Sequence, residues 1–166
     1  MVNEALEPTK DKATLVIFSG ELDKALAAFN IATTAAAMGM DVTMFFTFWG
    51  LNIIKKNEGR LQSSGWMERM LNWMNRGGSK RLPMSKFHML GLGTGMMKAL
   101  MRKRRMPSLE QMIQTAHKLG VHMIACNTTL GLMNITEEAL IPEVESVAGA
   151  ATFVGIAQES KISLFI

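Results

Sequence analysis

Residues 13–48 read ATLVIFSGELDKALAAFNIATTAAAMGMDVTMFFTF, in which two strand-like runs flank one helix-like run. The first run, residues 13–18, is short, β-branched and almost entirely apolar, which is typical of a strand buried on both faces. A Ser-Gly pair ends this run, and apolar residues then recur at helical spacing as far as Gly39. A second strand is predicted from Val42 to Phe48. Strand, long helix and strand together form a βαβ unit, whose crossover predicts parallel pairing.

The second half of the chain repeats this alternation. Residues 108–111, Ser-Leu-Glu-Gln, have the form of a helix capping box, and residues 121–125 and 161–166 resemble strands. Between the strands we expect a short helix through Met133 and, with apolar residues over 144–154, a helix weakened by Gly149 and Gly155. The sequence therefore predicts the α/β class, with three layers and a mostly parallel central sheet.

The whole chain, residues 1–166, is expected to form a single domain, because no repeat or linker divides it. Residues 1–12 are polar, and we expect them to form a flexible N-terminus. Residues 57–105 are expected to form an irregular insertion that contains helices. Within it, the sequence predicts an apolar helical stripe over residues 66–74, a short strand near 86–90, a glycine-rich loop at 91–95 and a basic helix over 96–105.

The charge of the chain is unevenly distributed. Eighteen basic residues exceed fourteen acidic ones, which gives a net charge of +4. Most of this excess lies in one basic run between residues 98 and 105. Such a run can attract an acidic partner or an anionic membrane surface, but a solvated face is the simpler interpretation. No aromatic ladder or nucleic-acid module accompanies the run, so no nucleic-acid partner is expected. The excess is concentrated in Lys98, Arg102, Lys103, Arg104 and Arg105.

The cysteine content and the apolar pattern bear on location. A single cysteine allows no internal disulfide, which disfavours a secreted scaffold. Residues 1–12 carry acidic side chains and lack the apolar core of a signal peptide. No uninterrupted apolar run reaches about 18 residues, the length of a membrane-spanning helix. We therefore expect a cytoplasmic protein.

The single cysteine, Cys126, is the strongest candidate for a reactive group. It follows a predicted parallel strand and precedes a predicted helix, and ligands of open α/β sheets gather at such strand ends. The positive end of the helix dipole favours a thiolate there. The alternative is a buried, inert cysteine, because free cysteine is among the most buried residue types. No base is assigned to it: His122 lies on the same strand about 13 Å away.

Other chemistries are weakly signalled. The histidines and acids show no spacing typical of metal ligands, so no metal site is expected. Gly91, Gly93 and Gly95 alternate and do not match the dinucleotide-binding pattern, and no phosphate-binding lysine motif occurs. No cofactor is therefore expected.

Four stretches of the sequence resemble the DsrE/DsrF/DsrH superfamily, and more specifically its DsrE2-like branch. They are LVIFSGE at residues 15–21, the basic stretch that begins GLGTGMMK at 91–98 and continues to 109, GVHMIACNTTLGLMNI at 120–135, and the tail over 149–166. The resemblance spans nearly the whole chain. It implies a compact flavodoxin-like or DsrE-like fold and homo-oligomeric assembly.

The resemblance also implies a function. It suggests a sulfurtransferase or sulfur carrier, in which Cys126 accepts sulfane sulfur as a persulfide and passes it to a protein or small-thiol acceptor. Asn127 and Thr128 would offer backbone N–H groups to the bound sulfur species, and Ser19 and Gly20 would line the same cleft. Sulfur donors and acceptors are the implied partners. A second hypothesis remains open: a non-catalytic, oligomeric binding module that docks an acidic partner or a membrane through its basic segment.

Overall fold

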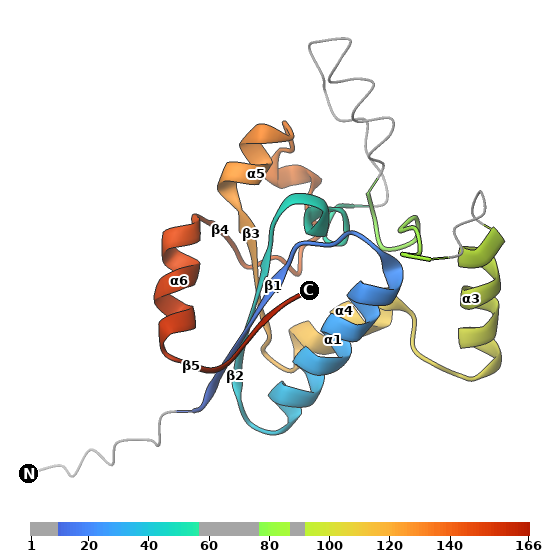
Figure 1. Cartoon of the computed structure of the whole chain (residues 1–166), viewed down its shortest axis with the longest axis horizontal. Helices are drawn as coiled ribbons and strands as arrows, with labels where there is room; N and C mark the ends of the chain where they lie inside the picture. The colour runs from blue at the N-terminus through green and yellow to red at the C-terminus, as the bar shows by residue number, and fades with distance from the viewer. Residues whose placement is uncertain (1–9, 57–76, 87–91) are drawn as a thin grey trace, which may run out of the picture.

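A parallel β-sheet forms the centre of the protein, as a computed structural model of residues 10–56, 77–86 and 92–166 shows (Figure 1). The strands lie in the order β4-β3-β2-β1-β5, and every described pairing between them is parallel. The predicted α/β class with a parallel central sheet is therefore confirmed. The five strands are β1 (Lys12–Ile17), β2 (Asp41–Phe46), β3 (His122–Cys126), β4 (Ser146–Ala148) and β5 (Ser160–Phe165).

Helices cover both faces of this sheet, which gives the three layers that the sequence predicts. Helices α1 and α4 pack against each other on one face, and α6 lies on the other face (Figure 1). Short 3-10 turns follow β2 and precede β4, at Phe48–Asn52 and Glu137–Ala139. The α-helices in the described residues are α1 (Leu22–Ala37), α3 (Leu92–Lys103), α4 (Leu109–Lys118), α5 (Asn127–Leu132) and α6 (Ala150–Gln158).

The alternation of side chains along the strands divides the apolar core in two. Met44 and Phe46 of β2 face the larger cluster beneath α1 and α4. Phe45, between them, faces the smaller cluster beneath α6, where its ring stacks on that of Phe153 with 4.9 Å between the ring centroids. Cys126 belongs to this smaller cluster. The reactive-residue candidate is therefore on the α6 side of the sheet.

The predicted start of α4 and the predicted end of α1 are confirmed. Ser108 and Gln111 form the capping box at the start of α4: the Gln111 amide donates to Ser108 Oγ at 3.3 Å, and Gln111 Oε1 accepts from the Ser108 amide at 2.8 Å. Gly39 and Gly120, which follow α1 and α4, have φ angles of +87° and +79°. Glycine adopts this left-handed conformation without steric cost, so it ends a helix readily.

Two sequence predictions are wrong in the second half of the chain. Residues 144–154 do not form one helix: residues 146–148 form β4, and α6 begins only after Gly149. Gly149 has an extended backbone and caps α6, so this glycine marks the start of a helix and does not weaken its interior. The basic helix begins at Leu92, before the predicted Met96, so Gly93 and Gly95 are helical and not part of a loop.

Some predicted features lie wholly or partly outside the described residues. These are residues 1–9 of the expected N-terminus, the apolar stripe over 66–74, and residues 87–91, which hold most of the expected short strand and the first residue of the expected glycine-rich loop. Lys12, the last residue of the expected flexible segment, already pairs in β1. In the part of the chain that the structure covers, we find no helix of the length and apolarity needed to cross a membrane.

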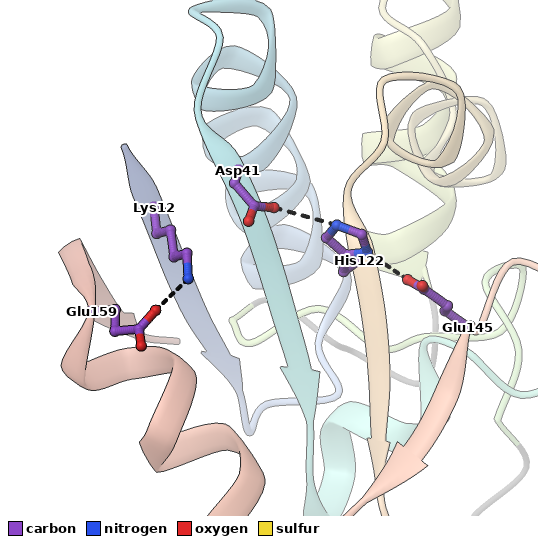
Figure 2. Close-up of polar contacts among 5 residues, drawn as sticks. All are labelled: Lys12, Asp41, His122, Glu145 and Glu159. Atoms are coloured by element: carbon purple, nitrogen blue, oxygen red, sulfur yellow. Dashed lines mark hydrogen bonds and ion pairs between the residues drawn. The ribbon is translucent and has the colours of Figure 1, made fainter. Parts of the chain in front are cut away.

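Ion pairs link the elements at the amino ends of the strands (Figure 2). His122 lies between two carboxylates: its Nε2 is 3.3 Å from Asp41 Oδ1 and its Nδ1 is 2.6 Å from Glu145 Oε2. Lys12 pairs with Glu159, which follows α6. Because His122 is the first residue of β3 and Cys126 the last, these contacts lie at the end of the sheet opposite the cysteine.

Candidate functional site

The candidate site lies where adjacent parallel strands end together. Phe46, the last residue of β2, pairs with Ala125 of β3, so Thr47 and Cys126 leave the sheet side by side. On the other side of β3, Cys126 pairs with Ala148, the last residue of β4. The strand order therefore places the carboxyl ends of β2, β3 and β4 around one thiol. This is the edge of the sheet at which α/β proteins bind ligands.

Cys126 is held at the junction between β3 and α5. It is the N-cap residue of α5 and only 5% of its surface is exposed. Its side chain makes no cap hydrogen bond of regular geometry. Thr129, in the first turn of α5, is 2% exposed, and its Oγ1 lies 2.9 Å from Thr47 Oγ1. These two hydroxyl groups lie beside the thiol and have an acceptor within reach.

The surroundings of Cys126 lower the pKa of its thiol. Burial is the largest single influence and acts to raise the pKa, because it disfavours the thiolate. The backbone amide and hydroxyl of Thr129, the hydroxyl of Thr47 and the amide of Thr128 oppose it, and together they outweigh it. Donors that stabilise the charged form favour thiolate, which is the nucleophilic form of cysteine. The pKa of the Cys126 thiol is therefore lower than that of an ordinary cysteine.

Helix α6 adds to this environment. Gly149, its N-cap residue, directly follows the strand partner of Cys126. A Cβ atom placed on Gly149 would lie 3.8 Å from Asn127 Oδ1, so the starts of α5 and α6 are neighbours. The amide ends of both helices carry partial positive charge. The thiol therefore lies in a polar, donor-rich junction, although apolar side chains surround its other side.

The structure brings two of the four predicted binding residues to the thiol. Asn127 and Thr128 are exposed next to Cys126, and Thr128 Oγ1 donates to Asn127 Oδ1 at 3.2 Å. The Thr128 amide contributes to the lowered pKa of Cys126. Both residues therefore lie at the exposed start of α5, next to Cys126.

The other two predicted binding residues lie farther along the same edge. Ser19 and Gly20 follow β1, and β2 separates β1 from β3. Ser19 Oγ accepts a hydrogen bond from Lys24 Nζ at 3.1 Å. A Cβ on Gly20 would lie 2.6 Å from the Trp49 carbonyl oxygen, so glycine is required for close packing at this position. Their described contacts are structural and do not involve Cys126.

Thr47 and Thr129 are residues of the site that were not predicted from the sequence. Thr129 carries a usable signal, because it is the third residue after the N-cap, where side chains and amides turn back toward the cap. Thr47 carries none, because it reaches the thiol only through the adjacency of β2 and β3.

Histidine does not assist Cys126 among the described residues. His122 lies at the opposite end of β3, and His117 lies on α4, which covers the other face of the sheet. His88 lies outside the described residues. Over residues 10–56, 77–86 and 92–166, no three histidine, cysteine or acidic side chains are grouped as metal ligands.

A parallel sheet covered by helices on both faces, with Cys126 at its carboxyl edge, places the protein among the three-layer α/β proteins. Residues 9–165 match the model of the DsrE/DsrF/DrsH-like family. The chain belongs to this family, as the sequence resemblance indicated.

Individual relatives span the same length. The uncharacterized protein YrkE of Bacillus subtilis is 38% identical over 160 residues, covering 96% of this chain and 99% of that protein. The sulfur carrier protein DsrE2 of Allochromatium vinosum is 35% identical over 165 residues, covering 93% and 98%. The solved structure of MTH1491 from Methanobacterium thermoautotrophicum, a protein of unknown function, matches with a TM-score of 0.54 at 12% identity. The match covers 95% of this chain and 100% of the MTH1491 chain, and at this identity it supports the fold alone.

Proposed function

We propose that the protein is a sulfur carrier or sulfurtransferase, and that Cys126 carries the sulfur as a persulfide. The observation that carries the proposal is the thiol itself, whose pKa is lowered by threonine donors at the end of β3. Family membership and the 35% identity to a protein named as a sulfur carrier support the same class of function. Cytoplasmic location remains part of the proposal.

The proposed reaction is a thiol exchange without net oxidation. The Cys126 thiolate attacks the outer sulfur of a donor persulfide, R–S–SH, and a new S–S bond forms. The donor S–S bond breaks, and its electron pair leaves with the donor as R–S⁻. An acceptor thiolate then attacks the outer sulfur of the Cys126 persulfide, and Cys126 leaves as a thiolate. No metal or organic cofactor is needed for either step.

The site geometry fits the second step as well as the first. When the persulfide is handed on, negative charge returns to Cys126 Sγ, where the hydroxyls of Thr47 and Thr129 can donate to it. A better-stabilised thiolate is a better leaving group. The 5% exposure of Cys126 favours reagents that deliver a single small sulfur atom over bulky ones.

Intact-protein mass spectrometry tests the proposal. Native protein is incubated with a polysulfide or glutathione persulfide and measured with and without reductant. We expect a gain of one or more sulfur masses that reductant removes, and no gain in Cys126→Ser. Thr43→Val serves as a control, because Thr43 is a buried threonine within β2 that pairs with His122, the first residue of β3. Loading that persists in Cys126→Ser would end the proposal.

Self-association is a further part of the proposal. On the α6 side and at the β5 edge, apolar residues remain exposed: Val154 is 51% exposed, Ile162 40% and Phe165 71%. Exposed apolar groups on neighbouring elements are common at contacts between subunits. Light scattering should give the mass of an oligomer, and Phe165→Glu should lower that mass.

The second candidate is a non-catalytic binding module in which Cys126 is merely buried. The exposed basic helix α3 favours it, because that helix offers a surface for an acidic partner or membrane. It predicts a thiol that small alkylating reagents do not modify until the protein unfolds. Fast alkylation of native Cys126 would argue against it.

A further inference from the structure

The side of α3 that faces solvent is apolar over most of its length. Leu92, Met96 and Leu100 recur every four residues and so share one face of the helix. They are 69%, 75% and 49% exposed. In α3, only Met101 is buried. A helix on the surface of a globular protein normally directs its apolar face inward, and α3 directs most of it outward.

Among the residues that the structure describes, none covers this face of α3, so it can meet a flat surface. The helix lies at the margin of the molecule, farther from the sheet than α1 and α4 (Figure 1). Its twelve residues span about 18 Å. The exposed face between Leu92 and Leu100 contains only apolar or small side chains, because the intervening positions are Gly95 and Ala99.

Positive charge is concentrated at the carboxyl end of the same helix. Lys103 continues the Leu92–Met96–Leu100 face by one further turn. Arg102, Arg104 and Arg105 are exposed around it, and residues 92–105 contain no acidic side chain. Arg102 and Arg105 also line an open groove of about 640 Å³, which Lys118 of α4 completes.

Lys98 differs from the other cations of the segment. Its Nζ donates to the Lys80 carbonyl oxygen at 2.5 Å, and burial lowers its pKa. It therefore faces the body of the protein and does not join the exposed cluster. The basic surface consists of Arg102, Lys103, Arg104, Arg105 and Lys118.

We propose that α3 is an interfacial helix that docks the protein on a membrane surface containing anionic lipid. Leu92, Met96 and Leu100 enter the headgroup and acyl boundary, while the basic surface contacts lipid phosphates. An apolar face and an adjacent cationic cluster together are the features that such helices combine. Charge complementarity selects anionic lipid, and each cation near the surface adds to the attraction. This docking is independent of the sulfur chemistry at Cys126.

Vesicle flotation with the full chain tests the proposal. Vesicles contain phosphatidylcholine alone or phosphatidylcholine with phosphatidylglycerol. We expect wild-type protein to float with the anionic vesicles only, and binding to fall as salt rises, because about 0.1 M salt screens charges beyond roughly 10 Å. Lys103→Gln combined with Arg104→Gln should weaken binding about thirtyfold. Met96→Glu combined with Leu100→Glu should weaken it at least about tenfold.

Matched variants control for lost charge and lost apolar surface elsewhere. Lys10→Gln with Lys161→Gln removes two positive charges beside β1 and β5, and Met38→Glu changes a methionine that is 77% exposed after α1. Both should bind vesicles as wild type does, and so should Cys126→Ser. If wild-type protein does not bind anionic vesicles at low salt, the proposal fails. An acidic protein then becomes the candidate partner for this face. If the Met96 and Leu100 variant binds normally, insertion of α3 is disproved.

A fluorescent label reports on the helix directly. Cys126→Ser provides a background without thiols, into which Met96→Cys or, as control, Gln158→Cys is introduced and labelled with an environment-sensitive dye. Anionic vesicles should shift the emission of the Met96 label to shorter wavelength and leave the label on α6 unchanged. Equal emission shifts at both positions, or none at Met96, would contradict docking through α3.

Discussion

The hydroxyl oxygens of Thr47 and Thr129 lie 2.9 Å apart, although 82 residues separate the two in the chain. One follows β2 and the other lies in the first turn of α5, and both contribute to the lowered pKa of Cys126. Burial alone would make this thiol inert, since it raises the pKa. The donors of these two threonines are therefore central to whether Cys126 reacts at neutral pH.

Thr129→Val should slow the reaction of native Cys126 with a small alkylating reagent. The substitution retains the shape of the side chain but removes a hydroxyl donor from the thiolate, so the pKa rises and less thiolate is present. At pH 7 we expect the rate to fall about fivefold. When the alkylation rate is measured from pH 5 to 10, its increase should occur at a higher pH in the variant than in wild type.

Thr47→Val tests the second member of the pair, and Thr43→Val is the control. Thr43 is a buried threonine within β2, and it pairs with His122, the first residue of β3, away from the thiol. Thr47→Val should shift the pH profile in the same direction as Thr129→Val, whereas Thr43→Val should leave it unchanged. Identical pH profiles for all three variants would show that the hydroxyls do not control the thiol.

Gly50→Ala should destabilise the fold and disturb the site. A Cβ at position 50 would lie 2.0 Å from the Ile17 carbonyl oxygen, so β1 and the 48–52 turn would have to move apart. We expect a loss of about 3 kcal/mol in the free energy of unfolding. Because the turn follows Thr47, alkylation of Cys126 should slow as well.

Gly155→Ala is the matched substitution. Gly155 lies within α6, and a Cβ there would meet nothing within 4 Å. Alanine has the higher helix propensity, so we expect a gain of about 0.5–1 kcal/mol. Denaturant unfolding of both variants checks the contrast. Equal effects of the two changes would mean that the close approach at Gly50 is relieved without cost.

The parts of the fold that sequence predicts well are those encoded by local periodicity. The apolar run at 13–18 and the capping box at 108–111 correspond to β1 and to the start of α4. The β4 strand has only three residues, which is too short for alternation to distinguish it from the helix that follows. What defines it is its pairing with β3, which no local pattern reveals.

The site shows the same division. Cys126 could be selected because its strand and helix are local features. Ser19 follows one predicted strand and Thr47 lies near the end of another, and the sequence offers no reason to prefer either as the neighbour of Cys126. The strand order decides between them, because β2 lies next to β3 and β1 lies one strand farther away. Contacts that arise only from the strand order therefore cannot be predicted from the sequence.

His122→Gln should leave the chemistry of Cys126 unchanged. His122 lies between Asp41 and Glu145 at the amino end of β3 (Figure 2). Cys126 is at the carboxyl end of the same strand. All three side chains are partly exposed, so their contacts contribute less than about 1 kcal/mol. We expect a small decrease in thermal stability and an unchanged alkylation rate. A pronounced loss of sulfur loading in this variant would show that the histidine acts on the thiol.

The contact between Asp23 and Ser85 gives a pH-dependent contribution to stability. The Ser85 amide donates to Asp23 Oδ1 at 3.0 Å, and the Ser85 hydroxyl donates to Oδ2. Burial, the largest influence, acts to raise the pKa of Asp23, but these bonds and those from its own backbone outweigh it and lower the pKa from 3.8. The contact joins the first turn of α1 to residues 77–86.

Asp23→Asn should therefore destabilise the protein by about 1 kcal/mol at pH 7, a value reduced by partial exposure of the carboxylate. Because the folded pKa is lowered, the stabilisation is fully present above the unfolded pKa and is lost as pH falls through the folded value. Urea unfolding at pH 7 and at stepwise lower pH should show the difference from wild type shrinking in acid. Ser85→Ala removes the hydroxyl donor and should show the same trend with a smaller amplitude. A difference that stays constant into strong acid would mean that the charge of Asp23 contributes nothing.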